Sequence, residues 1–130
     1  MNRFFTCLLA LLLLLGTMGG CSTSDAEASL SPVCPDKFSE TLITQLSQEP
    51  KRTPVAEITQ YTYLGQTVYL VTGGGAPTAN GGSTTLNYLF DTCGNVLCAA
   101  SGGANNQGDG RCPDFKANAT NPVLVWRDSR

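Results

Sequence analysis

The stretch VAEITQYTYLGQTVYLVT, residues 55–72, decides the fold class. Its two halves, 55–63 and 66–72, are rich in β-branched and aromatic residues, which favour strands. The connection Leu64-Gly65 has the two-residue length of a tight hairpin turn, although leucine is unfavourable there if the turn needs a positive φ. The stretch therefore predicts an antiparallel β-hairpin.

The segments that follow the hairpin extend the sheet. Strands are predicted at residues 84–90 (TTLNYLF), 95–98 (NVLC) and 123–127 (VLVWR). Leu124 and Trp126 alternate in the last of these strands, so we expect them to share one face of the sheet. Residues 73–83 and 99–111 are rich in glycine and lack periodicity, and they predict long, irregular and mobile surface loops.

A single helix is predicted ahead of the hairpin, over residues 35–48 (PDKFSETLITQLSQ). Phe38, Leu42 and Leu46 recur every four residues, so they line one side of a helix. Pro35 suits the first turn of that helix. Because the apolar stripe needs a sheet to cover, the sequence predicts an α+β domain with one N-terminal helix packed on a small antiparallel sheet of four or five strands.

The N-terminal segment predicts export. Arg3 precedes an apolar run over residues 4–15, which is shorter than the roughly 18 apolar residues of a transmembrane helix and is typical of a secretory signal peptide. Cys21 follows two glycines and resembles the lipobox cysteine of bacterial lipoproteins, which becomes a lipidated N-terminus. Met18 stands where that motif usually has leucine. We expect a protein on the periplasmic or cell-surface side, held to the membrane by a lipid on Cys21.

A soluble secreted protein is the alternative. Ala26-Glu27-Ala28 has the small-x-small pattern of an ordinary signal peptidase site, but it ends 13 residues beyond Leu15, farther than usual. The expected organisation is a removed signal peptide at 1–20, a lipidated cysteine and flexible tether at 21–33, and one domain at 34–130.

The cysteines fit an oxidising compartment. Of six cysteines, Cys7 lies in the signal segment, and Cys21 would be left over as a free thiol unless it is lipidated or discarded. The other four are Cys34, Cys93, Cys98 and Cys112. Two disulfides are expected among them, because the chain has no CxxC pair. Four cysteines allow three pairings, and sequence alone does not choose among them. We favour Cys98 with Cys112, which would close the base of a glycine-rich loop, and Cys34 with Cys93, which would join helix to sheet.

Composition argues against several function classes. The chain has no histidine, which removes the commonest general base, the commonest zinc ligand and any Ser-His or Cys-His pair. Eight Lys and Arg residues, one of which is Arg3, stand against ten Asp and Glu, so the chain from Cys21 carries a net charge of −3. Nucleic acid is therefore not an expected partner. We expect neither an enzyme nor a cofactor.

Two groups of residues are candidates for binding. Tyr61, Tyr63 and Tyr69 on the hairpin form a recognition surface if residues such as Ile58 fill the interior instead. Asn105, Asp109 and Asp114 offer oxygen atoms for calcium, but they lack the pattern of an EF-hand loop. Service in tight turns is the alternative role for these three residues.

Several segments resemble a group of uncharacterised small bacterial lipoproteins: YTYLGQTVY (61–69), LFD (89–91), GDGRCPDF (108–115) and WRDSR (126–130). The resemblance runs from Val55 to the C-terminus and implies location and domain type, with no reaction attached. We expect an exported binding or structural module with a protein partner at the cell envelope. The alternatives are an inhibitor of an exported enzyme that presents the loop at 99–111, and a calcium-dependent module.

Overall fold

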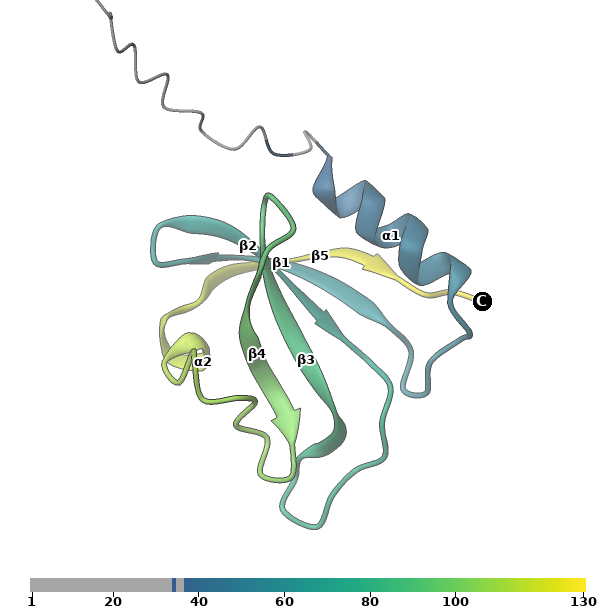
Figure 1. The fold of residues 1–130 in the computed structure, drawn as a ribbon, viewed down its shortest axis with the longest axis vertical. Coiled ribbons are helices and arrows are strands. Elements are labelled where there is room, and N and C mark those ends of the chain that lie inside the picture. Colours follow the sequence, from purple (N-terminus) through teal and green to yellow (C-terminus); the bar gives the residue numbers. More distant parts are fainter. Residues whose placement is uncertain (1–33, 35–36) are drawn as a thin grey trace, which may run out of the picture.

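The computed structural model describes Cys34 and residues 37–130 (Figure 1). The elements in chain order are α1 (Phe38–Gln48), β1 (Glu57–Tyr63), β2 (Gln66–Thr72), β3 (Ser83–Asp91), β4 (Val96–Gly103), α2 (Phe115–Asn118) and β5 (Thr120–Arg127). The predicted signal segment, Cys21 and the tether lie outside the described residues, as do Pro35 and Asp36. Neither helix in the described part is long and apolar enough to cross a membrane.

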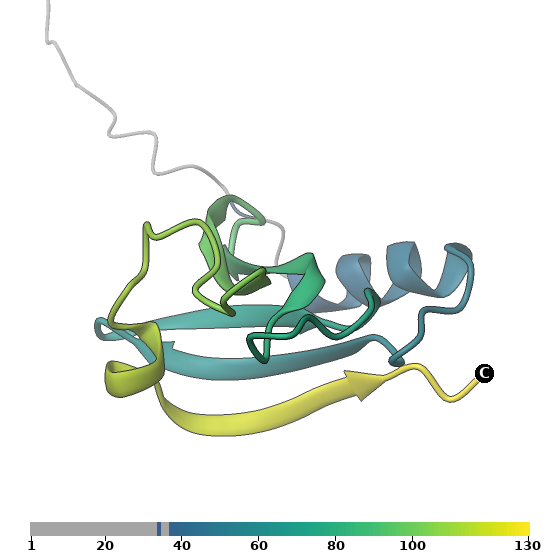
Figure 2. The same cartoon turned by 90° about the horizontal axis from the view of Figure 1, so that it is seen from below.

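The strands form one antiparallel sheet in the order β4-β3-β2-β1-β5, which confirms the predicted α+β class. The final strand returns to pair with β1, so β5 forms one edge of the sheet and β4 the other. The sheet is strongly twisted: β3 and β4 run at a steep angle to β1 and β2 in Figure 1, and they curl away from β5 in Figure 2.

The central hairpin forms despite its turn residues. Leu64 and Gly65 have φ values of 50° and 76°, so leucine occupies a left-handed conformation that costs a non-glycine residue about 1–2 kcal/mol. Seven residue pairs in continuous register join β1 to β2 and outweigh that cost. Leu64 itself is 72% exposed and contributes little packing.

Both faces of the sheet carry a core, because successive side chains of a strand point to opposite faces. We call one the helix-covered face; its buried residues are Leu42, Leu46, Ile58 and Val71. We call the other the loop-covered face; its buried residues are Tyr63, Val68, Leu70, Leu89, Cys98, Ala100 and Phe115. The helix-covered face confirms the predicted stripe, with Phe38 packed at its edge.

Both favoured disulfides are present. Cys34 pairs with Cys93, 59 residues away, and Cys98 pairs with Cys112, 14 residues away. The first connects Cys34, four positions ahead of the start of α1, to the turn between β3 and β4, and the second connects β4 to the segment before α2.

The prediction that β4 ends at Cys98 was wrong. The strand continues through Gly103, and Ala99 and Ala100 within it are buried. A side chain at Gly102 would run into the backbone oxygen of Thr85 on β3. Small residues are common in loops, but here the close approach of β3 requires them.

The prediction that Leu124 and Trp126 share a face was also wrong. Leu124 pairs with Thr59 and Trp126 with Ile58, which are neighbours on β1, because the register shifts between these pairs. Such a β-bulge reverses the alternation. Leu124 is consequently 55% exposed, whereas Trp126 packs against the helix-covered core. The short helix α2 was not predicted.

Candidate functional site

A pocket of about 430 Å³ opens beside the loop that connects β2 to β3, within the usual range for small-molecule sites. We call it the glycine-loop pocket. Its walls come from β1, β2, β3, β5 and the connecting loop, and they include Glu57, Thr72, Gly73, Gly74, Gly75, Ser83, Asn87 and Arg127. In Figure 1 the loop descends from the end of β2 to the start of β3.

Glycine is required where this loop packs against its neighbours. Gly73 has a φ of 109°, and a Cβ there would lie 2.5 Å from the backbone oxygen of Val55. Gly75 has a φ of 82°, and a Cβ there would lie 2.5 Å from both the Ser83 Oγ and the Thr85 Oγ1. The loop side of the pocket therefore carries no side chain at Gly73 and Gly75, because the neighbouring segments leave no room for one.

The loop is tied down more firmly than its composition suggests. The Gly74 N–H donates to the Pro54 carbonyl at 2.8 Å, and the Thr78 hydroxyl donates to the Ala104 carbonyl at 2.8 Å. The Gly82 N–H in turn donates to the Thr78 hydroxyl at 2.9 Å. These hydrogen bonds join the two glycine-rich segments of the chain and hold the pocket wall in place.

The charged groups of the pocket neutralise each other. Glu57 and Arg127 face each other across β1 and β5, and Arg127 Nε lies 2.7 Å from Glu57 Oε1. The Glu57 side chain is 29% exposed and that of Arg127 is 63% exposed, so a ligand can reach both. The two are the charged residues in the pocket lining, which therefore carries no net charge.

Uncharged polar groups also line the pocket. Asn87 Nδ2 donates to the Ser101 hydroxyl at 3.0 Å. Within the described residues, the Asn87 Oδ1 and the Thr72 hydroxyl have no hydrogen-bond partner, so both can bind a ligand or water. The same pocket includes the apolar side chains of Pro54, Val55 and Pro77.

The three candidate tyrosines do not form one surface. Tyr63 is 6% exposed. The rings of Tyr61 and Tyr63 pack edge-on against the ring of Phe115, and their centroids lie 5.3 and 5.2 Å from the Phe115 centroid. Tyr69 lies on the opposite face of the sheet, 6.0 Å from the ring of Phe38. The proposed patch required one uncovered face, whereas helix α1 covers one face and the segment around α2 covers the other.

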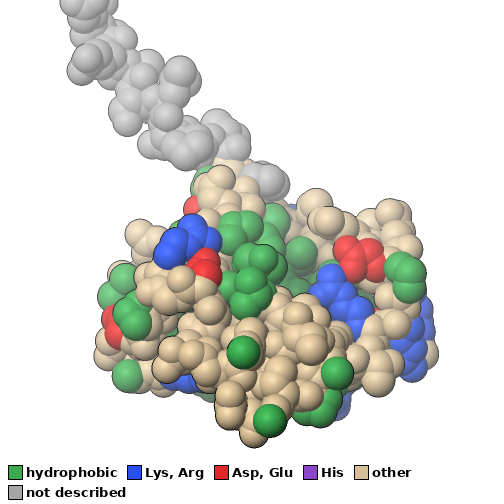
Figure 3. Space-filling view, turned by 60° about the horizontal axis from the view of Figure 1, so that its bottom comes forward, with side chains coloured by type: hydrophobic (Ala, Val, Ile, Leu, Met, Phe, Trp, Pro, Cys, Tyr) green, Lys and Arg blue, Asp and Glu red, His purple; other side chains and the backbone are tan. Residues whose placement is uncertain are grey.

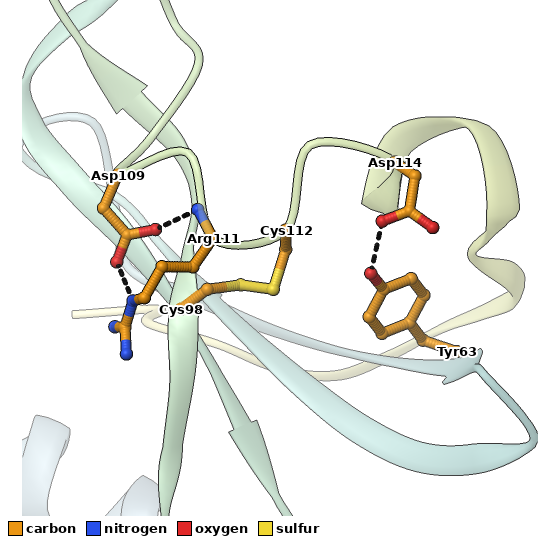
Figure 4. Close-up of a disulfide and its surroundings, with 6 residues drawn as sticks. All are labelled: Tyr63, Cys98, Asp109, Arg111, Cys112 and Asp114. Carbon is orange, nitrogen blue, oxygen red and sulfur yellow. Dashed lines mark hydrogen bonds and ion pairs between the residues drawn. A yellow bond between two sulfur atoms is a disulfide. The ribbon is translucent and has the colours of Figure 1, made fainter.

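Tyr63 instead has a structural partner. Its hydroxyl donates to Asp114 Oδ1 at 2.7 Å, as Figure 4 shows. This hydrogen bond raises the pKa of Tyr63 and, together with the one from Asn118, lowers the pKa of Asp114.

The calcium candidates are engaged in separate local contacts. Asp109 accepts hydrogen bonds from the backbone N–H and the Nε of Arg111 at 3.0 and 2.7 Å (Figure 4). The pKa of Asp109 is lowered to about 2, mainly by backbone hydrogen bonds. The Asn105 side chain bonds to Gln107, and Asp114 bonds to Tyr63. Over Cys34 and residues 37–130, no three Cys, Asp or Glu side chains group in a way that could hold a metal ion.

Hydrophobic side chains also reach the surface outside the pocket. Tyr88 and Val96 are 41% and 46% exposed, and neither lines the glycine-loop pocket. Figure 3 shows one face of the molecule, on which hydrophobic side chains gather in a hollow between charged groups. Apolar side chains are therefore exposed outside the glycine-loop pocket as well.

The sequence drew attention to the glycine loop but not to its partners in the pocket. Glu57, Thr72, Asn87 and Arg127 come from four different strands, and no motif connects them. The density of glycine between residues 73 and 82 was the one signal that could have indicated a close backbone approach.

The comparisons identify a family without an assigned activity. Neither the search of curated proteins nor that of solved structures found a match. A family model described as "Domain of unknown function (DUF6970)" matches residues 44–128, from within α1 past the end of β5, and so takes in the whole pocket. Because the match spans more than half of the chain and agrees with the expected uncharacterised family, this protein belongs to the DUF6970 family of domains of unknown function.

Proposed function

We propose that the chain is an exported lipoprotein whose domain is a non-enzymatic binding module held to a membrane through Cys21. The observation that carries the binding role is the glycine-loop pocket, which has the volume of a small-molecule site and reachable polar groups. Its carboxylate and its guanidinium form a partly exposed ion pair, and each keeps hydrogen-bonding capacity for a ligand.

The cysteine pattern supports export. Two disulfides stabilise the domain, and such bonds persist in oxidising compartments. The signal-like segment at 1–20 and the odd Cys21 match the same destination. Lipidation accounts for a cysteine that would otherwise remain unpaired in an exported chain.

Mass spectrometry of the native protein tests the export proposal. We expect the mature chain to begin at Cys21, to carry the mass of a lipid there and to fractionate with membranes. Cys21→Ser should abolish the lipid mass and release the protein from the membrane fraction. Cys7→Ser is the matched control, because that residue falls in the removed segment and the mature mass should not change. A mature chain that begins at Ser29 without lipid would overturn the proposal.

A second candidate is inhibition of an exported enzyme. It is favoured by the segment after β4, which the Cys98–Cys112 disulfide holds at its base and which exposes Arg111. Incubation of the protein with exported proteases and glycosidases tests this role. Loss of their activity, relieved by Arg111→Ala, would support inhibition, and undiminished activity throughout the panel would count against it.

A further inference from the structure

We infer that the glycine-loop pocket binds a neutral, hydroxyl-rich ligand, namely a saccharide unit. The inference rests on the proposed binding function and names the ligand class for that site. Three features of the pocket support it: the charge balance, the hydrogen-bonding groups of the walls and the glycine backbone of the loop.

Charge balance favours an uncharged ligand. Glu57 and Arg127 already satisfy each other at 2.7 Å, so an anion or a cation would have to compete with a partner that is in place. A guanidinium carries five N–H donors and a carboxylate has about four acceptor sites. One mutual contact therefore leaves both groups able to bind a neutral ligand that offers donors and acceptors together.

The remaining polar groups match hydroxyls. Each ligand hydroxyl both donates and accepts a hydrogen bond. The Thr72 hydroxyl can do either, and the Asn87 Oδ1 can only accept. Because neither group has a protein partner within the described residues, a ligand can bind both without breaking a hydrogen bond inside the protein.

The shape of the pocket suits a ring. Its loop wall is backbone at Gly73 and Gly75, where an added Cβ would collide with Val55 or Ser83. Pro54, Val55 and Pro77 add apolar surface that can cover the C–H groups of a sugar ring. The mixture of apolar surface with a few polar groups is the usual construction of a small-molecule site.

Amide chemical shifts of the ¹⁵N-labelled protein provide the test. The neutral probes are glucose, galactose, N-acetylglucosamine and maltose at millimolar concentration, and the charged probes are glutamate and inorganic phosphate. We expect at least one neutral probe to shift the amides of Thr72, Gly73, Gly74 and Gly75 in a saturable manner. The charged probes should leave these amides in place.

Two variants and a control locate the binding. Arg127→Gln should weaken saccharide binding at least tenfold, and Thr72→Val, which has nearly the same shape, should weaken it severalfold. Arg111→Gln is the matched control, because Arg111 is another exposed arginine in a 2.7 Å ion pair but lies outside the pocket. It should leave the affinity unchanged.

Each other outcome overturns the inference in a distinct way. Shifts of these amides with glutamate or phosphate but with no saccharide would overturn the ligand class while the binding function stands. No shift with any probe, neutral or charged, would overturn the ligand class and the binding function of this pocket together. Equal weakening by Arg111→Gln and Arg127→Gln would place the binding elsewhere. The export proposal is decided separately, by the mass of the mature chain.

Discussion

The two faces of the sheet are covered in different ways. On the helix-covered face, α1 presents a regular stripe in which Leu42 and Leu46 are buried against Ile58 and Val71. On the loop-covered face, the segment at 104–119 buries only one of its side chains, Phe115, beneath a largely irregular chain. A helix satisfies its own backbone hydrogen bonds, whereas an irregular segment must find partners elsewhere.

Those partners are present on the loop-covered face. The Cys98–Cys112 disulfide closes the segment, and the Tyr63 hydroxyl binds Asp114. Lys116 Nζ donates to the Asn106 carbonyl at 3.0 Å. The comparison shows that helix α1 is held to its face by repeated apolar packing, whereas the segment that covers the other face is held by a few separate attachments around one aromatic ring.

The largest expected effect comes from removal of that ring. Phe115→Ala should lower the free energy of unfolding by about 3–5 kcal/mol, because the substitution empties the centre of the loop-covered core. Denaturant unfolding measures the loss, and hydrogen exchange locates it. Exchange should accelerate over residues 104–119 while α1 stays protected. Leu46→Ala is the matched substitution on the other face, and it should accelerate exchange in α1 instead; identical exchange patterns would contradict the division into two cores.

Loss of the disulfide on the loop-covered face should have the next largest effect. The Cys98→Ala/Cys112→Ala variant opens a loop of 14 residues, which the chain-entropy account values at roughly 3 kcal/mol. Denaturant unfolding compares the variant with the parent protein under identical non-reducing conditions. A loss below about 1 kcal/mol would show that the Phe115 ring and the Tyr63–Asp114 bond suffice to hold the segment.

Besides the Cys34–Cys93 disulfide, the helix-covered face has an attachment at the C-terminus of the chain. Arg130 donates to the carbonyls of Leu46, Ser47 and Glu49 at the end of α1, at 3.2, 2.7 and 3.0 Å. Arg130→Ala leaves these carbonyls without that partner and should lower the melting temperature by on the order of 5 °C. Arg111→Ala is the control, because within the described residues the Arg111 guanidinium forms its ion pair with the nearby Asp109. Equal melting temperatures for both variants would remove the role assigned to Arg130.

The smallest expected effect is a dependence on acid pH. Arg130 holds Asp128 through hydrogen bonds and lowers the pKa of that carboxyl from 3.8 to about 2. A carboxyl with a lowered pKa stabilises the fold above its ordinary pKa, and the contribution is lost as the pH falls through the folded value. Urea midpoints should therefore fall between about pH 4 and pH 2.

The matched variants separate this carboxyl from others. Asp128→Asn should reduce the fall in the urea midpoint, to which Asp109 and Asp114 also contribute, whereas Glu40→Gln, which removes an exposed partner of Lys37, should leave the fall in place. If Asp128→Asn left the pH dependence of the urea midpoint unchanged, the acid sensitivity would belong to another group.

Much of the fold could be predicted because its elements have local signals. The helix shows an apolar repeat of about four residues, and the central hairpin and β3 are rich in β-branched and aromatic residues; all three appear within a few residues of the predicted limits. The extension of β4 over Ala99 and Gly102 could not be predicted, because small residues resemble a loop until β3 is placed against them. The bulge that separates Leu124 from Trp126 leaves no local signal either.

The candidate site was the least predictable part. Glu57 and Arg127 lie 70 positions apart in the chain, and only the return of β5 to the side of β1 brings them together. The three tyrosines, by contrast, stand close in the sequence, yet alternation along the strands and a cover on each face separate Tyr69 from the other two.

By itself, the sequence determined the helix, the central hairpin and the α+β class, because these depend on short-range spacing and on residue type. It favoured one disulfide pairing from the lengths of the closed loops, and the structure decided that pairing. Only the tertiary structure decided that both faces of the sheet are covered, that β5 pairs with β1 and that a glycine-walled pocket opens beside them. These features arise from close approach between segments far apart in the chain, and steric fit at such contacts has no local pattern.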